Sequence, residues 1–301
     1  MSEDCTVKAR FFEPPLGMRR YFTTFYLTEI EVADGGTVTD WLHPEWGGFR
    51  FSDGPLPHGG IEGKPPVPPT RFLAQGPTST TIRFVAGSFR MWGVGLLPLG
   101  WAKFVRTPAI ELADTIVDGE QHPTFAPFVP LADAIFAGDP DPEAEFARIA
   151  EFFAERAHLK VPDEGKIVAC HAALLDPEVF SVAEMAEHAR IPAYTLERLC
   201  RKHFGFPPQL LLRRQRFMRS IAQFMLDPSL KWIGALDDHY HDQAQFVRDF
   251  HRFMGMSPRE YSGRPHPILG AIMRARFAEA GAAVQALHPP RAEAASPAAL
   301  D

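Results

Sequence analysis

The sequence predicts an α+β chain in which a β-rich N-terminal domain precedes an all-helical domain. At 301 residues, the chain is long enough for two domains that each bury a core. Residues 1–130 contain short apolar and aromatic runs separated by Gly and Pro clusters, as strands and turns do. From about residue 140 onward the apolar residues recur at helical spacing. Within this second part, the pattern of Tyr194–Pro208 occurs again at Ala244–Pro258.

Three runs within residues 1–130 have the composition of strands. They are Tyr21–Val32, Gly47–Ser52 and Thr80–Leu96, and β-branched and aromatic residues recur in them. The segment Gly54–Pro69 holds many Pro and Gly residues. We therefore expect an exposed loop without regular structure there.

Residues 131–162 predict a helical linker. Asp141 and Pro142 suit a helix cap and first turn, and the apolar residues that follow lie on one stripe. One stripe needs only one partner surface, which favours packing on the chain's own domain. Pairing with the same helix of a second subunit is the alternative.

The helical domain is expected over residues 163–263. Within it, a segment opened by two prolines, 206–226, predicts a long helix that connects the two copies of the repeated pattern. The final segment, 264–301, is rich in Ala and Pro, and we expect it to be partly disordered, chiefly from about Ala280 on.

The internal repeat places equivalent residues 50 positions apart. Such a period is also known from solenoids and propellers, but these need roughly three or more units to bury a continuous core. Two copies instead indicate a duplicated supersecondary unit within one domain. The equivalent pairs are Leu196/Phe246, Arg198/Arg248, Lys202/Arg252, Gly205/Gly255 and Pro208/Pro258.

Each copy predicts two short helices joined by a tight turn. In the first copy, Ser181 and Glu184 can form a capping box that begins the first helix. The second helix, 193–203, directs Leu196, Leu199, Cys200 and His203 inward and leaves mainly Tyr194, Thr195, Arg198, Arg201 and Lys202 outward. Two short helices of which the second is basic outside are typical of a helix-turn-helix.

The second copy repeats this pattern with Phe246, Phe250 and Phe253 inward. Arg and Gln residues remain on its outer side. In the major groove, Arg can donate two hydrogen bonds to guanine and Gln can pair with adenine. Because successive major-groove faces of B-DNA lie about 34 Å apart, a rigid connecting helix would let one chain read two adjacent segments.

The charge is distributed unevenly. The whole chain carries a formal net charge of -6, which is unusual for a nucleic-acid binder. Between Arg190 and Arg219, however, eight basic residues face the single acid Glu197, giving +7 and leaving -13 for the rest. Local clusters of positive charge attract phosphate irrespective of the total. A basic helix face that is merely solvated is the alternative.

Residues 181–263 resemble the DNA-binding domain of the AraC/XylS family of bacterial transcription regulators. The resemblance rests on L-x-R at Leu196–Arg198, F-x-R-x-F at Phe246–Phe250, and G-x-x-P beginning at Gly205 and Gly255. Two helix-turn-helix units joined by a long helix make up that domain. The resemblance implies base contacts by Tyr194, Glu197, Arg198, Gln243, Gln245 and Arg248, and phosphate contacts by Arg201, Lys202 and Arg252.

Some positions depart from the family pattern. Pro192 stands where the family usually has a Ser cap, and Cys200 replaces a Phe. Neither change forbids the fold, because Pro is tolerated in a first helical turn and Cys is a small hydrophobe. In the second copy, Gly234 and His239 replace an aliphatic residue and a Gly. Gly234 and the acidic pair at 237–238 weaken the first helix of that copy, so base reading by the second copy stays an open question at this point.

The resemblance also implies that residues 1–130, which are similar to the cupin-like all-β sensor domains of the family, sense a small molecule or dimerise. Aromatic residues there would either line an apolar pocket or, as is commoner in strands, form the sheet core. They are Trp41, Trp46, Phe49, Phe51, Trp92, Trp101 and Phe104. The expected partners are duplex DNA, RNA polymerase, a small-molecule effector and a second copy of the chain, with no membrane partner.

The N-terminal residues and the cysteines indicate the compartment. The first residues include acids and no apolar run of signal-peptide length, and no window approaches a membrane span. Cys5, Cys170 and Cys200 are widely spaced, which favours neither a disulfide framework nor a thiolate metal site. We therefore expect a cytoplasmic protein with reduced cysteines.

A cupin-type enzyme is one competing function class. It would need closely spaced His and Glu ligands for a metal, whereas the candidates His43, Glu45, His58 and His122 are scattered. A dinucleotide motif begins at Gly93 and Gly95, but Pro98 occupies the third glycine position. We predict no catalytic residue, no metal and no cofactor. The other alternative is a helical protein-interaction or structural module that binds no specific DNA.

Overall fold

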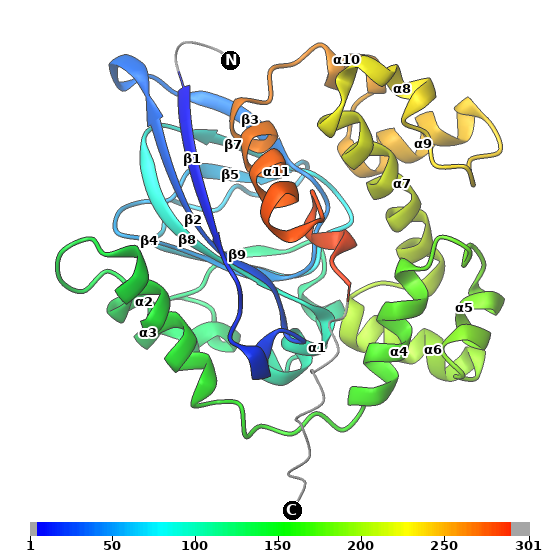
Figure 1. Cartoon of the computed structure of the whole chain (residues 1–301), viewed down its shortest axis with the longest axis horizontal. Coiled ribbons are helices and arrows are strands. Elements are labelled where there is room, and N and C mark those ends of the chain that lie inside the picture. The colour runs from blue at the N-terminus through cyan, green and yellow to red at the C-terminus, as the bar shows by residue number, and fades with distance from the viewer. Residues whose placement is uncertain (1–4, 290–301) are drawn as a thin grey trace, which may run out of the picture.

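The computed structural model describes residues 5–289 of the chain. Two β-sheets built from the N-terminal part fill one side of the molecule, and a helical region fills the other (Figure 1). This arrangement confirms the predicted α+β class. The last long helix, α11, leaves the helical region and lies beside β1 of the sheet region (Figure 1).

The larger sheet has six antiparallel strands in the order β1-β2-β8-β4-β6-β9. The predicted run Thr80–Leu96 divides into two strands, because the chain turns between Ala86 and Phe89 and the second half joins this sheet as β8. The strand bounds are β1 Cys5–Phe12, β2 Phe22–Val32, β8 Phe89–Leu96, β4 Gly48–Ser52, β6 Phe72–Gln75 and β9 Ile116–Asp118.

The smaller sheet has the order β3-β7-β5, with β3 Val38–Leu42, β7 Ile82–Ala86 and β5 His58–Ile61. β5 lies within the segment Gly54–Pro69, so the expectation of no regular structure there was wrong. The segment carries apolar residues that become buried, among them Ile61 and Val67. Gly59 also permits close pairing, since a Cβ at this position would lie 2.8 Å from the Cβ of Phe84.

The aromatic residues of the N-terminal part form the sheet core rather than a pocket. Phe49 and Phe51 point to one face of β4 while Arg50 between them points to the other, as strand alternation requires. On the Phe49 side, rings pack in pairs, for example Phe51 on Phe72 with centroids 4.6 Å apart. Six of the seven predicted aromatics belong to this cluster, and Trp41 belongs to a second cluster with the helices.

Two helices of the predicted linker cover this aromatic face. They are α2, Val129–Ala134, and α3, Pro142–Ala154. The ring of Phe146 lies 5.0 Å from that of Phe12, and Phe153 lies 4.9 Å from Phe22. The apolar stripe of α3 therefore packs on its own domain, as expected. Short helical turns complete this part: η1 Leu16–Met18, η2 Ala33–Gly35, α1 Pro98–Gly100, η3 Trp101–Val105, η4 Ala109–Leu112 and η5 Pro123–Phe128.

The helical region contains two helix-turn-helix units joined by α7 (Figure 1). The capping box predicted at Ser181 and Glu184 is present at the start of the first unit. The helix bounds are α4 Glu164–Leu175, α5 Val182–His188, α6 Ala193–Phe204, α7 Pro208–Leu226, η6 Pro228–Leu230, α8 Lys231–Gly234, α9 Gln243–Met254 and α10 Pro258–Ser262.

The sequence repeat corresponds to a structural repeat. α6 and α9 each have 12 residues and begin 50 positions apart. Each ends at a glycine in the left-handed region, Gly205 at φ 84° and Gly255 at φ 67°, where a residue with a Cβ is disfavoured. Each is followed by a helix that begins at Pro208 or Pro258. The repeated letters thus encode the end of one helix and the start of the next.

The two units differ in their first helix. α5 of the first unit has seven residues, whereas α8 of the second has four and ends at Gly234. This agrees with the weakening expected from Gly234 and the acidic residues after it. Asp237 instead begins the turn that leads to α9, where its carboxylate accepts a hydrogen bond from the backbone N–H of His239.

Helix α11, Pro267–Ala280, brings the chain back to the sheets, and the turn η7, Gln285–Leu287, follows it. Ile268 and Ile272 of α11 are buried against Ile30 and Phe84, one from each sheet. The Ala/Pro-rich C-terminal segment thus contains ordered structure up to residue 289, and residues 290–301 lie outside the described part.

The carboxylate of Asp40 holds the start of α11. It is fully buried in the middle of β3 and accepts hydrogen bonds from the backbone N–H of Ile268, at 3.0 Å, and of Leu269, at 2.8 Å. The ring of His266 lies 3.1 Å from its other oxygen. One carboxylate therefore accepts hydrogen bonds from two backbone N–H groups in the first turn of α11, where donors have no acceptor within the helix.

We predict that Asp40→Ala lowers the free energy of unfolding by about 2 to 4 kcal/mol, because two buried N–H groups lose their acceptor. Urea denaturation monitored by circular dichroism measures the change. Asp53→Ala is the matched control, since Asp53 is an exposed acid of the same domain. Equal stability of the two variants would show that Asp40 does not hold α11.

Candidate nucleic-acid interface

The outer face of α6 carries the residues predicted to read bases in the first unit. Tyr194 is 80% exposed, Arg198 is exposed and Glu197 is half-buried. The opposite face is buried through Leu196, Leu199, Cys200 and His203, as the periodicity predicted. Neither Tyr194 nor Arg198 hydrogen-bonds or ion-pairs with any residue within 5–289, so both side chains are available to a ligand.

The two predicted phosphate contacts of α6 have partners. Arg201 pairs with Glu197 one turn earlier at 2.8 Å, and Lys202 Nζ lies 3.2 Å from Asp163. Burial alone would raise the pKa of Asp163, but hydrogen bonds from Lys202 and His203 outweigh it and lower this pKa. Both pairs are half-exposed, and such pairs contribute only about 0.2 to 1 kcal/mol, so phosphate can compete for either cation.

The second unit presents α9 in the same manner. Asp242 caps the helix by accepting from the backbone N–H of Gln245 at 2.6 Å. In return, the side chain of Gln245 accepts from the N–H of His241 at 3.2 Å. Gln245 is therefore partly occupied by the cap. Gln243, Arg248 and Arg252 are exposed, and no ion pair joins them to any other residue in the described range.

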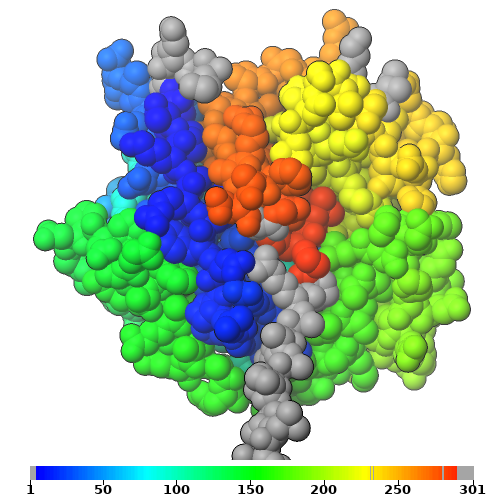
Figure 2. All heavy atoms as spheres, viewed as in Figure 1, coloured from blue at the N-terminus to red at the C-terminus, as the bar shows by residue number. Residues whose placement is uncertain are grey.

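The nine predicted DNA-binding residues form two groups, of which five lie on α6 and four on α9. α6 packs beside the start of α7, while Phe246, Phe250 and Phe253 of α9 pack around Phe217 in its middle. The two groups thus lie in separate units, and in the view of Figure 2 the first unit (green) lies below the second (yellow).

The positive charge counted between Arg190 and Arg219 is partly neutralised. Arg214 is fully buried. Arg213 and Arg216 on α7 pair with the buried carboxylate of Asp249, and Arg219 pairs with Asp237. Both acids belong to the second unit and lie outside the counted window, so the exposed excess is smaller than the sequence suggested. The exposed members are Arg190, Arg198, Arg201 and Lys202.

A hollow of about 310 Å³ lies between the two units. Arg213, Arg216 and Arg219 line it from α7, Phe180 and Ser181 from the first unit, and His239 from the second. We call it the inter-unit cleft. The sequence analysis did not predict a role for these arginines. Their spacing of three residues places them on one face of a helix, and this pattern could have identified them.

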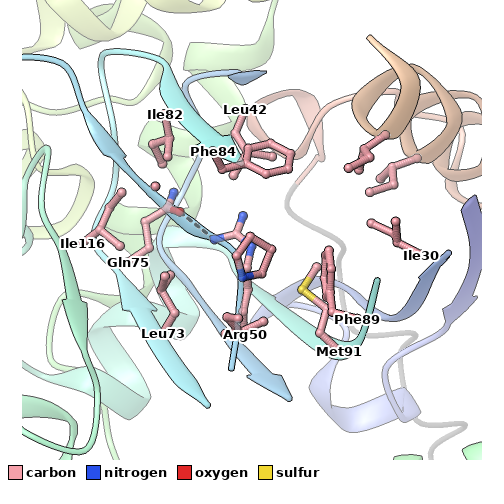
Figure 3. A pocket seen from close by; sticks show the side chains of 15 residues that line it. Ile30, Leu42, Arg50, Leu73, Gln75, Ile82, Phe84, Phe89, Met91 and Ile116 are labelled. Carbon is pink, nitrogen blue, oxygen red and sulfur yellow. Dashed lines mark hydrogen bonds between the residues drawn. The ribbon is translucent and has the colours of Figure 1, made fainter. Parts of the chain in front are cut away.

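The sheets enclose a second hollow, of about 70 Å³ (Figure 3). Apolar side chains of both sheets and of α11 line most of it, including Phe84, Met91 and Ile272. Arg50 projects into it and is hydrogen-bonded to Gln75 at 2.6 Å and to Glu45 at 2.5 Å. The sequence analysis considered a pocket among the aromatic residues, whereas this hollow lies between the two sheets.

A smaller hollow, of about 40 Å³, adjoins this hollow between the sheets. Arg50, Met91 and Ile272 line both. Arg276 of α11 lines this part, and burial lowers the pKa of this guanidinium. Glu45 lies near both arginines, so two guanidinium groups face one carboxylate. His43, also here, is neutral because burial lowers its pKa to about 3. The hollow therefore carries an excess positive charge.

The scattered His and Glu residues considered as metal ligands are not brought together. His43 Nε2 lies 2.6 Å from the hydroxyl of Tyr261, and Glu45 binds Arg50. Across residues 5–289, no group of three or more His, Cys, Asp or Glu side chains has a geometry that could hold a metal ion. Over the same range, no helix is both long enough and apolar enough to span a membrane.

A helix-turn-helix domain family matches residues 185–264, which include both recognition helices and α7. The chain carries an AraC-type helix-turn-helix domain. Because this domain binds DNA, the chain is a DNA-binding transcription regulator. The AraC-type domain ends before α11, so the contact of α11 with the sheets is an addition to it.

Solved structures show distant similarity over most of the chain. ToxT from Vibrio cholerae has 8% identity and a TM-score of 0.41, over 87% of this chain and 98% of ToxT. ToxT bound to (E)-4-(8-methylnaphthalen-1-yl)but-3-enoic acid gives 9% and 0.42, over 87% and 99%. The AraC-like transcriptional activator CuxR gives 12% and 0.24, over 72% and 87%. No curated protein matches the sequence.

We predict that Asp249→Ala lowers the free energy of unfolding by about 2 to 3 kcal/mol. Asp249 is 1% exposed and accepts hydrogen bonds from Arg213, Arg216 and Tyr240, so its loss leaves partly buried arginines unpaired. Thermal unfolding followed by far-ultraviolet circular dichroism reports the change. Asp238→Ala, an exposed acid in the turn of the same unit, is expected to change stability little.

Proposed function

We propose that the chain binds duplex DNA in a sequence-specific way, with its two units reading adjacent segments of the major groove. The placement of two 12-residue helices with exposed polar faces along α7 supports this most directly. With 19 residues, α7 is about 28 Å long at about 1.5 Å per residue. This is close to the spacing of about 34 Å between successive major-groove faces.

In this proposal, three outward residues of each recognition helix contact bases. Arg198 and Arg248 suit guanine, and Gln243 suits adenine, because their donors and acceptors match those bases in the major groove. The base-reading set is Tyr194, Glu197 and Arg198 of α6 and Gln243, Gln245 and Arg248 of α9. Arg201, Lys202 and Arg252 would bind phosphate. The first unit is the stronger reader, since Gln245 is engaged in its helix cap and α8 is short.

The domains follow from the same assignment. Residues 1–130 would sense an effector or dimerise, 131–162 would link, 163–263 would bind DNA, and 264–301 would follow as a tail whose first part contacts the sheets. A second copy of the chain and RNA polymerase are the further partners we propose. A regulator of this kind would act in the cytoplasm and catalyse no reaction.

The effector we propose is a small monoanion with an apolar body, bound between the sheets. Apolar walls and an excess positive charge from Arg50 and Arg276 support this class. The combined hollow is smaller than an engineered cavity of about 150 Å³ that accepts benzene, so a ligand of few atoms fits its present shape. Because α11 both lines the pocket and follows the second unit, effector binding would reach that unit through α11.

The first experiment is selection of random duplex DNA by the full-length protein, followed by sequencing of the recovered pool. Two enriched blocks about one helical turn apart support reading by both units. One block would restrict base reading to one unit. A protein-interaction module, the alternative function, would enrich no sequence and would lack the steep fall of log affinity with log salt that phosphate contacts produce.

We predict different losses for Arg198→Ala and Lys202→Ala. Arg198→Ala is expected to cost about 1 to 3 kcal/mol and to relax preference at one base position. Lys202→Ala is expected to weaken all sequences alike and to reduce the salt slope by about one unit. Binding titrations on the selected site and on its single-base variants separate the two effects. Even losses across random DNA for both variants would contradict the base-reading role of Arg198.

We predict that butyrate raises the melting temperature and that butyramide, its uncharged counterpart, does not. A ligand at about 100 times its Kd stabilises by about 2.7 kcal/mol, which corresponds to several degrees for a chain of this size. Arg276→Gln is expected to abolish the effect of butyrate. Arg274→Gln, which changes an exposed arginine of the same helix, should preserve it. A butyrate effect that survives Arg276→Gln would refute the assignment of the anion to this hollow.

A further inference from the structure

The inter-unit cleft has the features of an anion site. The side chains of Arg213, Arg216 and Arg219 enter it from one face of α7 and are 41%, 13% and 23% exposed, respectively. The ring of Phe180 stacks on that of His239 at 5.1 Å, which joins the two units at this place. The cleft is therefore built by both units and by the helix between them.

The arginines are held from behind by buried carboxylates. Asp249, 1% exposed, accepts from Nε and Nη2 of Arg213 and from Nη2 of Arg216, at 2.5 to 3.2 Å. Asp237, 6% exposed, accepts from Nε of Arg219. These bonds fix the planes of the guanidinium groups and reduce the side-chain entropy that a ligand contact would otherwise cost.

Several N–H groups remain for a ligand. Within the described part of the chain, Nη1 of Arg213 and both Nη atoms of Arg219 make no hydrogen bond. Nε of Arg216 also has no partner, but it is buried and out of reach of a ligand. Three guanidinium groups face two carboxylates, so the cleft carries one excess positive charge. Oriented, charged donors of this kind suit the oxygens of a phosphate group.

The position of the cleft determines which phosphate can reach it. When two recognition helices enter successive major-groove segments on one side of B-DNA, the minor groove and its two backbones lie between them. The cleft lies between the units. Gln245, a proposed base reader, also lines it, so it opens beside the second recognition helix.

We propose that the inter-unit cleft binds a backbone phosphate of the DNA that spans the two recognition segments, with Arg213 and Arg219 as donors. This rests on the proposed DNA-binding function and adds a contact outside both recognition helices. The contact carries no base information. It fixes the distance between the two segments, because a phosphate held at the centre sets the register of both units.

Ethylation interference on the selected DNA site tests the proposal. In the wild type, ethylation of phosphates that flank the central minor groove is expected to reduce binding, in addition to those beside the two recognition segments. Arg213→Gln should lose the central signal and keep the others. The variant leaves Asp249 bonded to Arg216 and Tyr240, and its melting temperature verifies that it folds.

Salt titrations provide a second readout. Arg213→Gln is expected to weaken binding about fivefold and to reduce the log–log salt slope by about one unit, on random as well as on selected duplex. Arg213→Lys should restore most of the slope, because it restores the charge. Arg274→Gln on α11 is the matched control and should leave both the slope and the central signal unchanged.

Three results would overturn the proposal: no central interference in the wild type, a central signal that persists in Arg213→Gln, or a normal salt slope in that variant. A melting temperature raised by inorganic phosphate through Arg213, without any change in DNA binding, would assign the cleft to a free anion instead. Failure of the DNA-binding function is distinct, since the wild type itself would then bind no duplex.

Discussion

α7 is the constraint on which the rest of the structure depends, because it packs against three partners at once. Twelve of its 19 residues are buried. Its apolar residues complete the cores of both units, Phe217 being the centre of the second. On another side, Arg214 donates to the carbonyl of Thr78 and Gln215 to that of Ala286, which joins the helix to the sheet region and to the segment after α11. α7 cannot rotate without breaking one of these contacts.

The helical region packs on the sheet region through continuous apolar clusters, but one buried charge lies within this contact. Arg214 is fully buried, stacks 4.0 Å above the ring of Trp46 and has no carboxylate in contact, so burial lowers its pKa to about 9. Burying a guanidinium group without an acid partner costs desolvation free energy that no ion pair repays. If α7 separated from the sheet region, Arg214 would become hydrated. The free energy gained in this way would offset part of the free energy lost by exposing apolar surface.

The helical part was predictable from the sequence because its signals are local. The capping box at Ser181, the inward Phe246 and Phe250, and the terminal glycines are each read within one or two helical turns. The roles of Asp40 and Asp249 were not predictable, because their partners lie 228 and 36 positions away. Likewise, β5 forms because distant β7 pairs with it, although the Gly and Pro content around it predicts a loop.

The acidic balance of the chain is compatible with DNA binding because its positive charges differ in availability. Arg213, Arg216 and Arg219 are held by acids, while Arg198 and Arg248 are exposed without ion partners in the described part. Non-specific affinity grows with the number of free cations, whereas base discrimination depends on a few well-placed donors. The rest of the chain carries a net negative charge, which disfavours non-specific contact with DNA there. The acids cancel two of the three α7 charges, so the arginines of the inter-unit cleft add about one phosphate contact to the binding of any duplex. Discrimination between sequences then rests on the base readers of α6 and α9.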